Sequence, residues 1–266
     1  MAEMELNLKD KSVLVAAASS GIGLATAELF LAEGAKVSIC SHNPEKLARA
    51  ALELYQKTSR RPLSFECDLT KEPEIEKWVK ESEKTYGPAQ VLVTNTGGPP
   101  TGSWSELSPE NWQRAYDLIL RSVMKLTRLV VPPMQKANWG RIVFISSVAA
   151  RQSIPSLASS STFRAALLGY AKVLAHDLGK HNITVNSVLP GYTLTDRQKE
   201  LAAKTAAQTG KTPEEIIQSW EAGIPLGRTA RPEEIAAAVV FLASEKAGYI
   251  TGVALPVDGG RIPTIV

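Results

Sequence analysis

The stretch SVLVAAASSGIGLATAELF, residues Ser12–Phe30, decides the fold of this chain. It begins as an apolar, β-prone run and continues as a helical pattern, with Gly21 and Gly23 at the turn between the two. A helix that starts at such a turn presents free backbone N–H groups, which bind phosphate. Glycine is required there because a Cβ atom would block the approach of a pyrophosphate. The stretch therefore predicts a strand–turn–helix unit that holds a dinucleotide.

The same alternation of short apolar runs and longer helical stretches continues along the chain. Runs such as RIVFI (141–145) are apolar on both alternations, which is typical of strands covered on both faces. Strands are expected at Ser12–Ala17, Lys36–Cys40, Leu63–Cys67, Val91–Thr94, Arg141–Ile145, Thr184–Leu189 and Val253–Val257. Helices are expected at Gly23–Glu33, Pro44–Gln56, Glu72–Tyr86, Pro109–Met134, Ser160–Lys180 and Pro232–Ala243. This order predicts an α/β fold: a Rossmann-type, doubly wound parallel sheet of seven strands with helices on both faces, in one domain over residues 1–266.

Residues 195–223 interrupt this alternation. Two polar helical pieces, TDRQKELAAKTAAQ and PEEIIQSWEA, stand where a single crossover helix would be enough. An insertion at this place lies beside the carboxyl ends of the strands, where open sheets bind ligands. We interpret residues 195–223 as a substrate lid, and a helical decoration packed for stability is the alternative.

The composition limits the classes of partner and site. The net charge is only +3, and the Lys and Arg residues are scattered, which argues against a nucleic-acid partner. An acidic N-terminus and the lack of any run of about 20 apolar residues predict a cytoplasmic protein without a membrane partner. The histidines have no metal-ligand spacing, so no metal is expected. Cys40 and Cys67 are interpreted as small buried residues that close two strands, with a reactive thiol as the alternative.

Polar and glycine-rich segments follow several of the predicted strands. Asp68 ends the third strand, NTGG (95–98) ends the fourth, and PGYTLT (190–195) follows the sixth. Because all carboxyl ends of a parallel sheet lie at one edge, these segments are expected to line the same cleft as the glycine turn.

Together these segments resemble the short-chain dehydrogenase/reductase family over nearly the whole chain. The framework is most similar to the β-ketoacyl-ACP reductases, which end in a stretch much like LGRTARPEEIAAAVVFLASEKAGYITGVALPVDGG (226–260). The resemblance implies an oxidoreductase with a small-molecule carbonyl or alcohol substrate, for which a 3-oxoacyl thioester is one candidate. It also implies a homotetramer.

The resemblance further implies how the chain holds a nicotinamide dinucleotide. Gly21, Ile22 and Gly23 would hold the pyrophosphate, Asp68 would contact the adenine, and Pro190, Gly191 and Thr195 would hold the nicotinamide end. The full set of expected cofactor-binding residues is Ala17, Ser20, Gly21, Ile22, Gly23, Ser41, His42, Asp68, Leu69, Asn95, Gly97, Arg164, Pro190, Gly191 and Thr195.

Two positions of this cofactor site affect how tightly a dinucleotide binds and which one is preferred. Family members usually begin the motif with Thr-Gly, whereas this chain has Ala16 and Ala17, and the extra methyl group is expected to weaken binding without forbidding it. At the end of the second strand stand Ser41, His42 and Asn43, with no carboxylate to bond a ribose 2′-OH or to repel a 2′-phosphate. NADP(H) is therefore favoured over NAD(H).

The catalytic positions depart furthest from the family. Its members use a serine, a tyrosine thirteen residues later, a lysine four residues after that, and an asparagine on the preceding long helix. Ser147 matches the serine, but the other places hold Ser160, Arg164 and Ile119. Serine is a weaker and shorter acid than tyrosine, whereas arginine keeps the positive charge and can still stabilise a developing oxyanion. Ser147, Ser160 and Arg164 are the expected catalytic residues, and Tyr192 is an alternative proton donor.

Two functions remain open at this point. The first is an oxidoreductase with an altered active site, supported by the glycine turn, the PGYTLT segment and the expected lid. The second is a dinucleotide-binding sensor or regulatory subunit without hydride transfer, supported by the missing Tyr, Lys and Asn.

Overall fold

The sheet is built outward from β1 (Ser12–Val15), which pairs in parallel with β2 (Lys36–Ser41) on one side and β4 (Val91–Thr94) on the other. In the computed structural model, which describes residues 5–264, the strand order is β3-β2-β1-β4-β5-β6-β7. The other strands are β3 (Leu63–Glu66), β5 (Gly140–Ile145), β6 (Ile183–Pro190) and β7 (Ala254–Val257). All of the pairings are parallel, so the expected seven-stranded, doubly wound sheet in a single domain is confirmed. The order reverses between β1 and β4, which is where such sheets open a ligand crevice.

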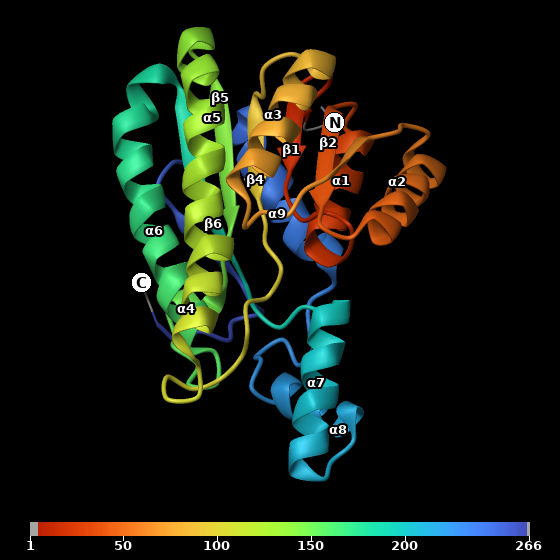
Figure 1. Ribbon diagram of the computed structural model, residues 1–266, viewed down its shortest axis with the longest axis vertical. Coiled ribbons are helices and arrows are strands. Elements are labelled where there is room, and N and C mark those ends of the chain that lie inside the picture. The colour runs from red at the N-terminus through yellow and green to blue at the C-terminus, as the bar shows by residue number, and fades with distance from the viewer. Residues whose placement is uncertain (1–4, 265–266) are drawn as a thin grey trace.

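Helices cover both faces of this sheet (Figure 1). One face carries α1 (Gly21–Ala32), α2 (Pro44–Thr58) and α9 (Pro232–Ala243). The other face carries α3 (Glu72–Tyr86), α4 (Pro109–Tyr116), α5 (Ser122–Ala137) and α6 (Ala158–Leu178). The strands carry apolar residues at both odd and even positions, and these side chains pack against the two helix layers, as the pattern predicts.

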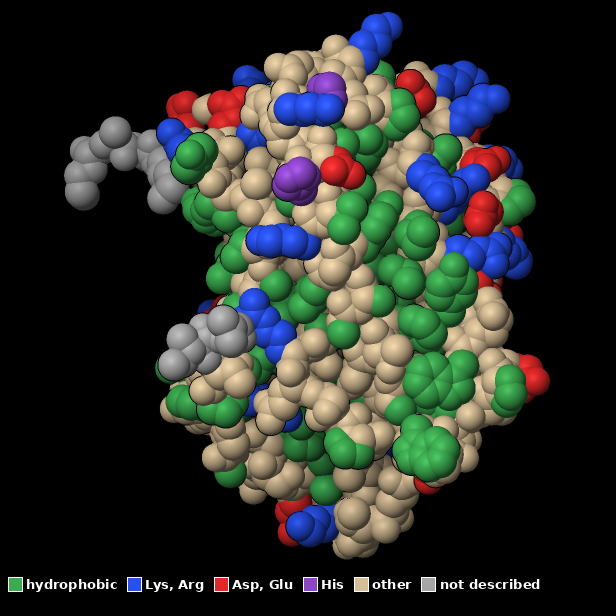
Figure 2. Space-filling view, turned by 90° about the vertical axis from the view of Figure 1, so that its left-hand side faces the viewer, with side chains coloured by type: hydrophobic (Ala, Val, Ile, Leu, Met, Phe, Trp, Pro, Cys, Tyr) green, Lys and Arg blue, Asp and Glu red, His purple; other side chains and the backbone are tan. Residues whose placement is uncertain are grey.

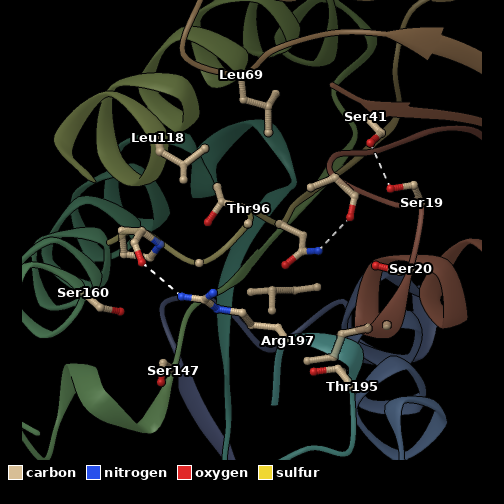
Figure 3. Close-up of a pocket in the computed structure, with 18 of the residues that line it drawn as sticks. Ser19, Ser20, Ser41, Leu69, Thr96, Leu118, Ser147, Ser160, Thr195 and Arg197 are labelled. Atoms are coloured by element: carbon tan, nitrogen blue, oxygen red, sulfur yellow. Dashed lines mark hydrogen bonds between the residues drawn. The ribbon is translucent and has the colours of Figure 1, made fainter. Parts of the chain in front are cut away.

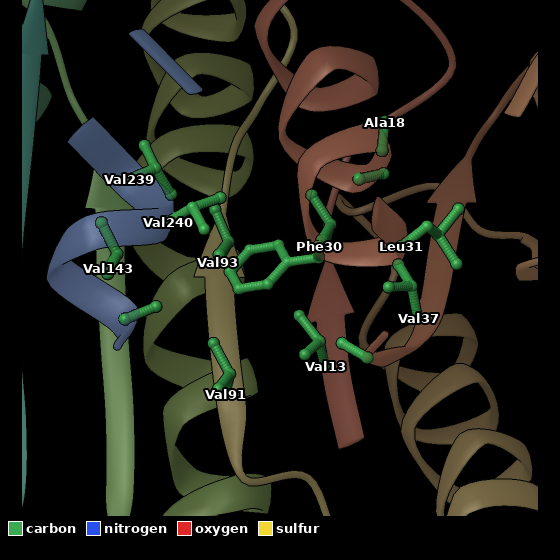
Figure 4. Packing of buried hydrophobic residues seen from close by; sticks show 14 of the residues in the cluster. Val13, Ala18, Phe30, Leu31, Val37, Val91, Val93, Val143, Val239 and Val240 are labelled. Carbon is green, nitrogen blue, oxygen red and sulfur yellow. The ribbon is translucent and has the colours of Figure 1, made fainter. Parts of the chain in front are cut away.

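The packing around Phe30 shows how one strand serves both layers. Phe30 of α1 is fully buried against strand residues such as Val13 and Val93 (Figure 4). Their chain neighbours Leu14 and Leu92 point to the opposite face and belong to the second core. This period of two explains why the central strands carry almost no polar residues.

One predicted helix is interrupted. The sequence predicts a single helix over Pro109–Met134, but a π-helical turn at Asp117–Arg121 separates α4 from α5. A π turn inserts an extra residue and changes which side chains face the sheet, a change that apolar periodicity does not reveal. Here Ile119 is fully buried in the core, while its neighbour Leu118 lines the cavity described below.

The segment 195–223 forms two helices, α7 (Asp196–Thr209) and α8 (Pro213–Glu221), as the sequence predicts. The pair projects beyond the body of the domain (Figure 1) and has a small apolar cluster of its own, centred on Ala202, Ala206 and Ile216. None of the helices within residues 5–264 has the length and apolar character that crossing a bilayer requires.

The turn between β1 and α1 has an unusual backbone. The sequence predicts a first strand that reaches Ala17, but β1 ends at Val15, and Ala17 adopts a left-handed conformation with φ of 48°. The carbonyl oxygen of Ala17 accepts a hydrogen bond of 3.1 Å from Asn95 Nδ2. A Cβ atom at Gly23 would stand 2.6 Å from the same oxygen, so only glycine lets the helix start this close to the strand.

Ala17→Gly is expected to stabilise the protein. A non-glycine residue in the left-handed region costs about 1–2 kcal/mol, and the greater freedom of glycine in the unfolded chain returns part of that gain. The free energy of unfolding should rise by about 0.5–1 kcal/mol in urea denaturation. The control is Ala18→Gly, since Ala18 is buried without a positive φ and its replacement should cost stability. A loss of stability in Ala17→Gly would contradict the account of this turn.

Candidate active site

A cavity of about 490 Å³ opens at the carboxyl edge of the sheet, between the start of α1 and the start of α7. This volume lies in the range of small-molecule sites. The expected cofactor-binding and catalytic residues that line it are Ala17, Ser20, Gly21, Ile22, Ser41, His42, Asp68, Leu69, Asn95, Gly97, Ser147, Ser160, Arg164, Pro190, Gly191 and Thr195. Gly23 is not among the lining residues, because it packs behind the turn against Ala17.

The N-terminus of α1 is left open for a ligand. Its N-cap Ser20 makes no side-chain cap hydrogen bond, so the first backbone N–H groups of the helix have no capping partner from Ser20. Gly21 has a φ of +57°, and a Cβ atom there would meet Thr195 Cγ2 at 3.0 Å. Thr195 itself caps α7 by accepting a hydrogen bond of 3.3 Å from Gln198 N. The start of α7 thus packs against the start of α1 at Gly21, and both helix starts border the cavity, where they can attract an anion.

The end of β2 offers hydroxyl groups, an imidazole and a lysine. Ser19 Oγ donates to Ser41 Oγ at 2.9 Å (Figure 3), and Asn43 N donates to the same oxygen at 3.2 Å. The cavity lining here includes His42 and also Lys46, a residue that sequence reasoning missed. Lys46 stands on the first turn of α2, one turn beyond the strand end, where a search confined to strand ends does not look. This end of the cavity suits a phosphate monoester.

Asp68 is held as an anion beside these groups. Its Oδ1 atom accepts from Thr70 N at 2.9 Å and from Thr70 Oγ at 2.8 Å. Partial burial alone would raise the pKa of Asp68, but these two hydrogen bonds, with Lys71 and His42 nearby, lower it below the ordinary value. Asp68 is therefore ionised at neutral pH and can only accept hydrogen bonds.

One buried hydroxyl in the lining has no partner. Thr96 Oγ1 is buried and makes no hydrogen bond within the described residues. Such an orphaned group costs free energy unless a ligand supplies a partner. With the open helix start and the glycine cradle, it indicates that the residues present fit a dinucleotide.

The far end of the cavity holds the three expected catalytic residues. Arg164 Nε donates to Ser160 Oγ at 3.2 Å, and Arg164 Nη1 donates to the carbonyl oxygens of Ile145 and Ser146 at 3.1 and 2.8 Å. Ser147 begins the 3₁₀ turn Val148–Ala150 and accepts from Ala149 N at 3.1 Å. Helix α6 thus presents Ser160 and Arg164 one turn apart, toward the carboxyl end of β5.

Arg164 carries an uncompensated charge. Its side chain keeps some accessible surface toward the open cavity, yet the surrounding protein desolvates it and lowers the pKa of the guanidinium to about 10. The group is still a cation at neutral pH. Within residues 5–264 it forms no ion pair with a carboxylate, and its partners are carbonyl oxygens and the hydroxyl of Ser160. A cation held this way attracts any negative charge that appears in the cavity.

Two side chains considered from the sequence lie elsewhere. The ring of Tyr192 is stacked on Trp220 with centroids 4.9 Å apart, and the guanidinium of Arg261 lies over the same ring, 4.0 Å from its centroid. Tyr192 is not among the lining residues, so the structure gives no support to a proton donor from that side. Ile119, which the resemblance sets at the family's asparagine, is buried in the core and contributes no polar group.

Arg197 lines the cavity although the sequence did not single it out. It stands in the first turn of α7, where the helix dipole disfavours a cation. That unfavourable placement was the available signal, but it is visible only once the start of the helix is known.

A metal cluster and the two cysteines were the other sites to consider in the described residues. Within the described residues, no group of three or more His, Cys, Asp or Glu is placed to hold a metal ion. Cys40 and Cys67 are both free and buried, and burial raises the pKa of the Cys40 thiol well above its usual value. This agrees with the interpretation of the two cysteines as small core residues.

Comparison with known proteins places this geometry in a family. A family model described as enoyl-(acyl carrier protein) reductase matches residues 16–261. The chain is 35% identical over 253 residues to the 3-oxoacyl-(acyl-carrier-protein) reductase FabG of Chlamydia muridarum, and the match covers 95% of this chain and 98% of that protein.

Solved structures agree with the sequence matches. L-sorbose reductase from Gluconobacter frateurii, complexed with NADPH and L-sorbose, superposes with a TM-score of 0.93 and 32% identity over 98% of this chain and 100% of the other. A variant of actinorhodin polyketide ketoreductase with NADPH gives a TM-score of 0.90 and 33% identity, over 95% and 97% of the two chains. The chain belongs to the short-chain dehydrogenase/reductase family of oxidoreductases.

Proposed function

We propose that this oxidoreductase reduces a carbonyl substrate with NADPH, and that Ser147, Ser160 and Arg164 take the places of the family's usual catalytic groups. The observation that carries the proposal is the hydrogen bond of 3.2 Å from Arg164 to Ser160, in the same cavity as an open dinucleotide site. The related reductases named above also support it, since two of their structures contain NADPH.

The proposed cofactor site uses the residues already described. The start of α1 would hold the pyrophosphate, Asp68 would accept from the adenine, and Thr96 would find the partner it lacks. His42 and Lys46 would face a 2′-phosphate, which is the reason for favouring NADP(H) over NAD(H). The bound cofactor supplies the hydride.

The chain itself would supply the proton and the orientation. Ser160 Oγ accepts from Arg164, so its own hydrogen is free to be donated to the substrate oxygen. Arg164 then stabilises the negative charge left on Ser160, because the cation is fixed by two backbone carbonyls and needs no reorganisation. Ser147, at the end of β5, would hold the same substrate oxygen. This arrangement replaces a phenol by a hydroxyl that relies on its cationic neighbour.

The sensor alternative gains no support from the comparisons. The relatives named above are reductases by name. Ser160 and Arg164, which we propose stand in place of the tyrosine and lysine, are in direct contact. A proton donor therefore still lies beside a cation.

We also propose that residues 195–223, which form α7 and α8, are the substrate lid. Two side chains of α7 reach the loop after β4: Arg197 Nη2 donates to Pro99 O at 3.3 Å, and Lys204 Nζ donates to Thr101 Oγ1 at 3.1 Å. Both contacts involve partly or fully exposed groups, so they can open and close at little cost.

A cytoplasmic homotetramer is the proposed assembly. Figure 2 looks onto the side of the molecule where α6 lies and shows hydrophobic side chains gathered along it. Val173 on this helix is 58% exposed, and a contiguous exposed apolar patch is typical of a surface that a second copy covers. Sedimentation equilibrium should give four times the 28.7 kDa of one chain, and a monomer mass would contradict this assembly.

The cofactor preference can be tested at the end of β2. Replacing both His42 with Ala and Lys46 with Met should weaken NADPH binding by about tenfold or more, since a hydrogen bond from the charged Lys46 contributes about 1.5–3 kcal/mol. NADH binding, which lacks the phosphate contact, should change little. Quenching of tryptophan fluorescence measures both affinities. An equal loss for the two cofactors would argue against a phosphate site here.

The catalytic role of Arg164 can be tested against a second buried arginine. Arg164→Met should lower kcat by about 100-fold, the usual effect of losing a group that stabilises an oxyanion. The matched control is Arg141→Met: Arg141 also donates to backbone carbonyls, of Gly140 and Asn182, but does not line the cavity. The control should lose stability and keep its kcat. Unchanged kcat in folded Arg164→Met would contradict the proposed role.

A further inference from the structure

The charges that line the cavity are unbalanced. Its lining contains the cations Lys46, Arg114, Arg164 and Arg197 but a single carboxylate, Asp68. Asp68 lies at the end of β3, where Thr70 satisfies its Oδ1 atom. The proposed 2′-phosphate accounts for Lys46 alone. The half of the cavity around Ser147 and Ser160 is therefore positive, and within the described residues the only ion pair of its cations joins Arg197 to Glu200 at 3.5 Å.

Arg197 reaches into this half from the lid. In Figure 3 its side chain extends from the Thr195 side of the cavity toward the side where Ser160 lies. The approach is close, because a Cβ atom on Gly98 would stand 2.6 Å from Arg197 Nε. A residue other than glycine at position 98 would displace the guanidinium. The loop after β4 thus leaves room for this side chain in the cavity.

The present partners of Arg197 are weak. Its Nη2 atom donates to Pro99 O at 3.3 Å, and its Nη1 atom lies 3.5 Å from Glu200 on the same helix. Both distances exceed the usual 2.7–2.9 Å of a charge-assisted hydrogen bond. The helix dipole adds a further unfavourable term, because Arg197 stands in the first turn of α7. An anion in the cavity would give this guanidinium a better partner than either group provides.

We infer that Arg197 is a specificity-determining residue that binds an acidic group of the substrate. The protein then prefers a carbonyl compound bearing a carboxylate to its uncharged ester. This inference rests on the proposed function, in which Ser160 and Arg164 hold the reacting oxygen. Arg197 and Arg164 would hold the two ends of one small acid: the lid arginine takes the carboxylate, while the arginine of α6 faces the carbonyl.

The anion that Arg197 binds could instead be the pyrophosphate of the cofactor. A guanidinium binds either group through the same fork of N–H donors. The two anions predict different effects of changing Arg197, one on the affinity for an added acid and the other on the affinity for the cofactor. A substrate carboxylate makes the binding of an added acid sensitive to this residue, whereas a pyrophosphate contact makes cofactor binding sensitive to it.

The experiment measures both affinities without turnover. Malonate, a small dicarboxylate that cannot be reduced here, is titrated calorimetrically into the complex with NADP⁺, and NADP⁺ is titrated separately into the free protein. Arg197→Gln should weaken malonate binding by about tenfold or more, as expected for a lost charge-assisted hydrogen bond, with NADP⁺ affinity unchanged. Arg197→Lys should recover part of the malonate affinity.

Lys204→Gln is the matched control. Lys204 lies on the same helix and contacts the same loop through Thr101, but it does not line the cavity. It should leave malonate affinity unchanged. Three results would overturn the inference: wild-type protein that does not bind malonate, an Arg197→Gln variant that weakens NADP⁺ and not malonate, or equal losses in Arg197→Gln and Lys204→Gln.

A kinetic comparison separates this inference from the proposed function. Wild-type protein with NADPH should reduce acetoacetate or pyruvate with a higher kcat/KM than the corresponding methyl ester, and Arg197→Gln should remove that preference through KM. If no carbonyl is reduced while malonate binding still depends on Arg197, the proposed reduction fails and the acid site stands. If the esters are preferred, the acid site fails and the reduction stands.

Discussion

The close approach of α1 to the end of β1 is the constraint on which the site depends. It requires Gly23, since a Cβ atom there would collide with the carbonyl oxygen of Ala17. Asn95 holds that same oxygen from the end of β4, so the turn, the helix start and the neighbouring strand are fixed as one unit. Because the first N–H groups of α1 have no side-chain cap, this unit presents a rigid, electropositive edge to a ligand. The left-handed Ala17 shows that the chain accepts strain to keep this arrangement.

A second constraint acts at the other end of the cavity. Arg164 is fixed by the carbonyls that end β5 and by Ser160, and no carboxylate of the described chain neutralises it. Burial without a counter-charge costs stability, and Arg164 differs from the equally unpaired Arg141 in that it lines the cavity. The cost is understandable if the charge serves a ligand or a transition state. The fold thus places an uncapped helix start and an uncompensated cation in one cavity, the arrangement on which the proposed reduction relies.

Much of this could be predicted from the sequence, for physical reasons. Alternating apolar runs and helical stretches identify a parallel sheet, and all its carboxyl ends must meet at one edge. For that reason residues as distant as Gly21, Asp68 and Asn95, chosen only as strand-end residues, line a single cavity. Ser160 and Arg164 were identified from the family's spacing and not from periodicity, and their hydrogen bond is one that two residues four apart on a helix can make.

Other features could not be predicted, because they depend on local geometry that the apolar pattern does not encode. The π turn that buries Ile119 leaves the helical periodicity nearly unchanged. The left-handed backbone of Ala17 appears only when strand and helix are joined. Tyr192 is held away from the cavity by Trp220 and Arg261, which are distant in sequence. Such contacts require the tertiary structure.

The most direct test of the central claim follows the hydride itself. NADPH carrying deuterium at its transferable position is incubated with the protein and a panel of ketones, oxo acids and 3-oxoacyl thioesters, and the products are analysed by mass spectrometry. The account predicts an alcohol that has gained one deuterium from at least one member of the panel. Tight binding of NADPH with no deuterated alcohol from any of them would contradict it, and would identify the chain as a dinucleotide-binding protein without hydride transfer.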